Sequence, residues 1–124
     1  MNVEAWLEEV WSRTRAACVL AGGEGEGPLD KRRILGEAFD TAELARLREL
    51  TTTGEFTGDI CRCRGSVTIG LLDVDAEWIG QASVHGLDGV SWERHRFRND
   101  LTVADPEGLG RFLSRYPGLR RLST

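Results

Sequence analysis

The chain has 124 residues, of which 40% are hydrophobic and 29% charged, enough for one domain with its own core. Its net charge of -4 at pH 7 disfavours nucleic-acid binding, which needs a basic surface. The odd number of cysteines and an acidic N-terminus unlike a signal peptide indicate a cytoplasmic protein with reduced thiols. Its apolar runs are too short to predict a membrane segment.

The first predicted element is a helix over residues 3–21. Apolar side chains recur there at steps of three and four, which is the spacing of one helical face, and Asn2 is a suitable N-cap. Trp6 and Trp11 belong to this stripe. They either pack on the core or form an exposed anchor for a partner or for a second copy of the chain.

The stretch 22–32 is rich in glycine and glutamate, which predicts a flexible linker. The single domain 1–124 would then consist of an N-terminal helix over 1–21 and an α+β body over 33–118. Residues 119–124 are expected to be a tail.

The body begins with a predicted strand over residues 33–39 and a helix over 41–50. Asp40 is the expected N-cap of that helix, with Phe39 and Leu44 as a hydrophobic staple around it. A closing helix is predicted over 106–116, because Asp105 can cap it and Pro106 suits its first position.

The clearest strand pattern covers residues 59–73, where apolar and polar side chains alternate. Cys61 and Cys63 share the apolar side of this strand, whereas Arg62 and Arg64 share the polar side. The alternation "CRCR" is therefore the period of a half-buried strand, and the two thiols are expected to be inert packing groups.

A second strand runs back to a hairpin at "GLDGV", and a third, "VSWERHRF", completes a meander whose outer half is strongly charged. A two-residue turn would pair Val84 with Glu93. A three-residue loop over 87–89, with Gly89 left-handed, pairs Val84 with Trp92 and keeps both apolar groups on one face, so this register is preferred. The predicted fold is α+β, with an antiparallel sheet packed by helices.

A metal site would need Cys61 and Cys63 together with His85 or His95. In the preferred register the histidines lie on the face opposite the thiols, so no metal and no cofactor is predicted. Nucleophilic catalysis is also disfavoured. Serines, a histidine and a glutamate gather on one face, but no nucleophile elbow or oxyanion loop can be recognised.

The remaining feature is a polar sheet face that could bind a protein. The alternative is a sheet face that is simply solvated and carries cross-strand ion pairs. As a binding surface it would suit an acidic or mixed-charge partner, with arginine as the dominant contact. The candidate binding residues, with the two tryptophans of the first helix, are Arg62, Arg64, Ser83, His85, Ser91, Glu93, Trp6 and Trp11.

Three segments, "CRCRGSVTIGLLD", "SVHGLDGVSWE" and "NDLTVADPEGLGRFL", resemble a group of small, often actinobacterial, proteins of uncharacterised function. That group has a C-x-C-x-G strand, a His-His-Gly hairpin, a strand ending in tryptophan and a closing helix. Val84 stands where its first histidine would be. The resemblance covers residues 33–118 and implies no activity; the corresponding positions are Cys61, Cys63, Gly65, His85, Gly86, Trp92 and Asp100.

The favoured hypothesis is a non-catalytic, cytoplasmic interaction module that binds a protein through the polar sheet face. An immunity-type protein or an accessory subunit would fit this description by type. The alternative is a thiol- or zinc-dependent enzyme that uses Cys61, Cys63 and His85.

Overall fold

The computed structural model describes residues 2–23, 27–58, 65–86 and 88–116. In chain order the helices and strands are α1 (Val3–Arg13), β1 (Ala16–Ala21), the short 3-10 helix η1 (Leu29–Lys31), β2 (Ile34–Ala38), α2 (Thr41–Thr52), β3 (Gly54–Phe56), β4 (Val67–Leu72), β5 (Trp78–His85), β6 (Gly89–Trp92), α3 (Arg94–Phe97), β7 (Leu101–Val103) and α4 (Pro106–Leu113).

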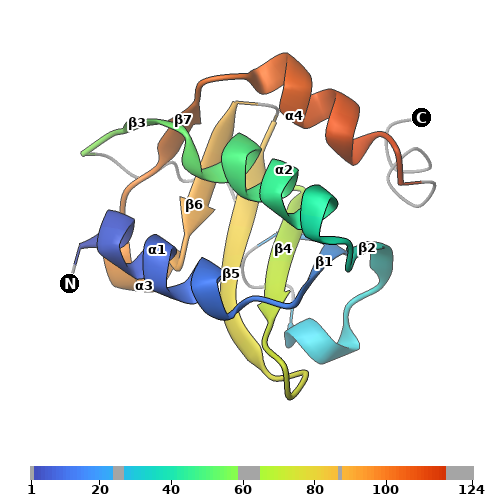
Figure 1. The fold of residues 1–124 in the computed structure, drawn as a ribbon. Helices are drawn as coiled ribbons and strands as arrows, with labels where there is room; N and C mark the ends of the chain where they lie inside the picture. Colours follow the sequence, from blue (N-terminus) through green and yellow to red (C-terminus); the bar gives the residue numbers. More distant parts are fainter. Residues whose placement is uncertain (1, 24–26, 59–64, 87, 117–124) are drawn as a thin grey trace.

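Within the described residues, seven strands form one sheet in the order β2-β1-β4-β5-β6-β7-β3, and every neighbouring pair is antiparallel. Helices α1, α2 and α4 lie together over one face of this sheet (Figure 1). The predicted α+β class with an antiparallel sheet is confirmed. The predicted number of strands is too low, because β1, β3 and β7 were not foreseen.

The hydrophobic core lies between the sheet and the three helices. Alternate strand residues such as Val67, Ile69 and Leu71 on β4 are buried in it, as the period-two pattern requires. Trp92 lies at the centre, with ring centroids 6.1 Å from Trp6 and 6.0 Å from Trp11. No helix in the described part of the chain is both long enough and apolar enough to cross a membrane.

The predicted helix over 3–21 is wrong after residue 13. Thr14 takes an extended conformation at the helix end, its hydroxyl donates to the Val10 carbonyl, and Ala16–Ala21 forms a strand between β2 and β4. This strand is buried on both faces, so its apolar run carries no alternation to mark it. Residues 22–32, predicted as a linker to a separate body, connect two adjacent strands of one sheet.

Both hairpin registers considered for the β5–β6 pair are wrong. Val84 pairs with Val90, and Trp92 pairs with Ala82. Gly86, with a φ of 63°, supplies the left-handed residue of the loop, whereas Gly89 lies in the strand opposite His85. The preferred register differs from the observed one by two residues, so Val84, His85, Ser91 and Trp92 still lie on their predicted faces.

The other predicted boundaries hold more closely. Asp40 and Asp105 cap α2 and α4 through hydrogen bonds from the backbone N–H groups of Glu43 and Gly108. The last helix ends at Leu113, earlier than predicted. The predicted third strand ends at Trp92, and its charged half forms α3. The predicted strand over 59–73 is seen as β4, and residues 59–64 and the tail lie outside the described residues.

Candidate functional site

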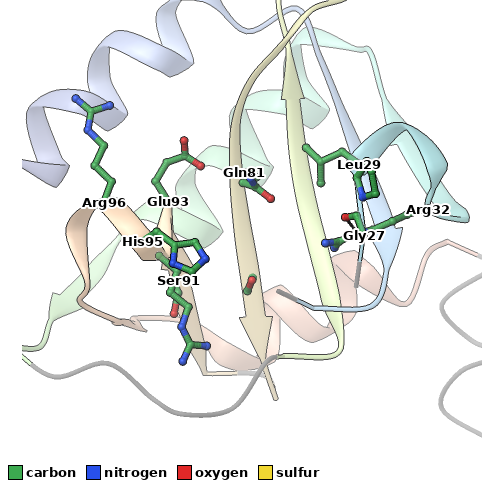
Figure 2. A pocket seen from close by; sticks show the side chains of 11 residues that line it. Gly27, Leu29, Arg32, Gln81, Ser91, Glu93, His95 and Arg96 are labelled. Carbon is green, nitrogen blue, oxygen red and sulfur yellow. Dashed lines mark hydrogen bonds between the residues drawn. The ribbon is translucent and has the colours of Figure 1, made fainter. Parts of the chain in front are cut away.

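A pocket of about 350 Å³, lined mostly by polar and charged residues, lies on the sheet face opposite the three helices, and we call it the sheet-face pocket. Its floor comes from β5 and β6, one wall from the loop around η1, and the other from α3 (Figure 2). The residues that line it are Gly27, Pro28, Leu29, Arg32, Gln81, Ser83, Ser91, Glu93, Arg94, His95 and Arg96.

Arg32 holds the loop wall in place. Its Nη1 donates to Thr68 Oγ1 on β4 at 2.6 Å, and its Nε donates to the Gly27 carbonyl at 3.0 Å. Thr68 Oγ1 in turn donates to the Gly22 carbonyl at 2.8 Å. These oxygen partners are all neutral, so the guanidinium brings a full positive charge to the pocket edge.

The second wall begins at Glu93, where the chain leaves β6 in a left-handed conformation with φ 41° and ψ 61°. A residue with a side chain rarely adopts this conformation, and such positions concentrate at functional sites. The sharp turn starts α3 at once and places Arg94, His95 and Arg96 beside the pocket (Figure 2).

A hydrogen-bonded chain of three polar side chains supports the floor. Ser91 Oγ lies 2.9 Å from His85 Nε2, and its hydroxyl donates to the Asp100 carboxylate. Because a hydroxyl has only one proton, His85 must donate its Nε2–H to Ser91. Ser91 is 1% exposed and His85 9% exposed, so the polar sheet face is covered here, contrary to the solvated face of the alternative interpretation.

This polarity of the hydrogen bonds argues against a serine nucleophile. An imidazole activates a serine by accepting its proton. Here the imidazole donates to the hydroxyl, and the hydroxyl proton points to a carboxylate. These three hydrogen-bonded side chains therefore form a fixed polar link between β5, β6 and the segment that precedes β7.

Gly65 closes the end of β4 against His85. Its φ is 79°, and a Cβ at this position would lie 2.8 Å from the Val84 carbonyl oxygen and 3.4 Å from His85 Nδ1. Gly65 thus lies beside His85, which together with Asp100 is hydrogen-bonded to Ser91; all three are positions that carry the resemblance.

We expect Gly65→Ala to lower the free energy of unfolding by about 2 to 4 kcal/mol. Alanine is strained in this left-handed conformation, and its Cβ would clash with the Val84 carbonyl oxygen. Urea denaturation followed by circular dichroism would measure the loss. Gly58→Ala is the matched control, since a Cβ there would meet nothing within 4 Å. Equal effects of the two substitutions would contradict the prediction.

Among the described residues that line the sheet-face pocket, Glu93 is the only carboxylate. Burial raises the pKa of this carboxyl, while a backbone hydrogen bond from Gln81 and the Arg96 guanidinium partly oppose the rise. An acid with a raised pKa in the folded state makes the protein less stable as the pH rises. Below the ordinary glutamate range both states are protonated and the penalty disappears.

Glu93→Gln should therefore stabilise the protein at pH 7, by up to about 1 kcal/mol. The gain should shrink as the pH falls and vanish below about pH 4, near the ordinary glutamate pKa. Thermal melts of wild type and variant across this range would test it. Glu55→Gln, at an exposed position on β3, is the control. A gain that does not depend on pH would contradict the assigned cause.

The structure brings Ser83, His85, Ser91 and Glu93 together, as the alternation predicted. Trp6 and Trp11 are each 6% exposed and pack in the core, so neither is an exposed anchor; of the two alternatives, packing is the one observed. The other predicted site residues, Cys61, Arg62, Cys63 and Arg64, lie outside the described residues.

Residues 2–23, 27–58, 65–86 and 88–116 contain no group of three histidine, cysteine or acidic side chains that could hold a metal ion.

Cys18, the free cysteine in this part of the chain, is buried on β1. Burial, and then the neighbouring Glu37, raise the pKa of its thiol. Rapid labelling of the native protein by a thiol reagent would therefore report on Cys61 or Cys63.

Three arginines of the site, Arg32, Arg94 and Arg96, were not predicted. Arg32 belongs to a stretch whose composition predicts a linker, and the "RHR" run belongs to the charged half of a predicted strand.

Comparisons with protein-family models, with curated proteins and with solved structures find no match to the chain.

Proposed function

We propose that the protein is a non-catalytic interaction module, of the immunity or accessory-subunit type, which binds an acidic side chain of a protein partner in the sheet-face pocket. The supporting observation is the charge of the described residues that line it: three guanidinium groups surround hydroxyl and amide groups, against one carboxylate. Arginine forms paired hydrogen bonds with a carboxylate, and it is common among the dominant contacts of protein interfaces.

The pocket is also suited to binding because it is preorganised. Its serine floor is fixed by strand pairing and by the His85–Ser91–Asp100 hydrogen bonds, and its loop wall is tied to β4 through Arg32. A rigid receptor loses little conformational entropy when a ligand binds. Gln81 is exposed on the floor and offers an amide to the same ligand (Figure 2).

Affinity purification from a lysate of the source organism tests the proposal. Wild-type protein, Arg96→Glu and Arg111→Glu are immobilised at equal density, and the recovered proteins are quantified. Arg96 lines the pocket, whereas Arg111 is exposed on α4 in the helical layer and serves as the control.

A partner retained by wild type and Arg111→Glu but at least tenfold depleted on Arg96→Glu is the expected result. Recovery of nothing above background, or equal recovery on all three proteins, would refute the proposal. The recovered partner should also be displaced by excess of a glutamate-rich peptide and not by a lysine-rich peptide of equal length.

A further inference from the structure

A second, larger hollow of about 650 Å³ lies between the C-terminal end of α1 and the length of α2, and we call it the α1–α2 groove. Trp11 and Leu44 contribute apolar surface to it. Phe39, just before α2, lines the same groove and is 63% exposed. An aromatic side chain left so open beside a hollow is typical of an interaction surface.

The groove also carries positive charge. Arg15 and Arg48 line it, and neither has a carboxylate partner within the described part of the chain. Arg15 donates instead to the carbonyl oxygens of Ser12 and Thr14. Glu49, the one acidic residue among the described residues of the lining, already pairs with Arg46 at 2.8 Å. The groove is therefore complementary to an acidic ligand.

Trp11 supplies an independent observation. Its side chain is 6% exposed, and its indole Nε1–H is a buried donor without an acceptor among the described residues. The neighbouring Trp92 differs, because its Nε1–H donates to the Thr51 carbonyl at 2.9 Å. Buried donors are almost always paired in folded proteins, so the Trp11 indole is an unusual buried group next to the groove.

We propose that the α1–α2 groove binds an acidic amphipathic helix of a protein partner. The apolar face of that helix would cover Phe39 and Leu44, and its carboxylates would pair with Arg15 and Arg48. Trp11, which lines the groove, would lie beneath that helix. A groove along a 12-residue helix has the length that helix-in-groove recognition uses.

This surface does not depend on the sheet-face pocket. Its lining comes from α1, α2 and the residues next to them, on the helical side of the sheet, whereas the pocket lies on the other side. The two proposals can therefore fail separately. Arg96→Glu should leave binding at the groove unchanged.

The test uses the full chain and a labelled helical peptide of about 18 residues with leucines on one face and glutamates beside them. A second peptide has lysine at every glutamate position. Fluorescence anisotropy should show at least tenfold tighter binding of the acidic peptide. Arg15→Glu with Arg48→Glu should weaken it at least tenfold, and Arg111→Glu should not.

The Trp11 indole gives a readout that nonspecific attraction would not change. Its Nε1–H resonance, assigned with Trp11→Phe, should move when the acidic peptide is added. The Trp78 indole, on the opposite sheet face against Gly70, should not move. Absence of binding, equal binding of the basic peptide, an unaffected double variant or an unmoved Trp11 resonance would each overturn the proposal.

Discussion

Replacement of Trp92 by alanine is expected to lower the free energy of unfolding by about 4 kcal/mol, the largest loss from any single substitution considered for this protein. Its side chain is fully buried and contacts the Trp6 and Trp11 rings. Alanine would leave a cavity where β6 meets α1, and it would remove the donor to the Thr51 carbonyl.

Two further variants separate these causes in chemical denaturation. Trp92→Phe keeps most of the apolar volume but loses the hydrogen bond to Thr51, so an intermediate loss of about 2 kcal/mol is expected. Trp78→Ala removes the same side chain from a half-buried position on the other face and should cost less than Trp92→Ala. A loss below about 1.5 kcal/mol for Trp92→Ala would contradict the central place of this residue.

The first 21 residues show why an apolar pattern alone was insufficient. The spacing of Trp6, Val10 and Trp11 correctly predicts a helix, and Ala17 and Ala21 continue the same steps by coincidence. A central strand buried on both faces has no alternation, and it contains alanines that also favour helices. Only the pairing of β1 with β2 and β4, which is remote in sequence, decides its structure.

The candidate site was predictable only in part, for a related reason. Period-two alternation assigns Ser83, His85, Ser91 and Glu93 to one face even when the register is wrong by two residues. It does not reveal what covers that face. The loop held by Arg32 and the left-handed turn at Glu93 turn an open sheet face into a pocket, and both depend on contacts across the fold.

Period-two alternation does not predict contacts between side chains that are distant in sequence. Asp100 precedes β7, a three-residue strand with no alternation long enough to be recognised. Its contact with Ser91 follows from the pairing of β6 with β7, which also brings Gly89 opposite Thr102. The polar link below the pocket therefore appears only when the complete strand order is known.

Ser91→Ala tests this link and should lower the free energy of unfolding by about 2 to 4 kcal/mol. The substitution removes the acceptor of the His85 Nε2–H and the donor to Asp100 together, and an unmade hydrogen bond costs most where the groups are buried. Ser83→Ala is the matched control. Ser83 faces Ser91 across the strands, is also buried, and makes no side-chain hydrogen bond to another described residue.

A double-mutant cycle with Asp100→Asn then shows whether the three groups act as a unit. Ser91→Ala removes the hydrogen bond that Asp100→Asn weakens by making the acceptor neutral, so their combined effect should fall short of the sum by about 1 kcal/mol or more. Additive losses, or equal losses from Ser91→Ala and Ser83→Ala, would mean that the hydroxyl only fills space. The pocket floor would then lack the rigidity on which tight binding of a carboxylate by its arginines depends.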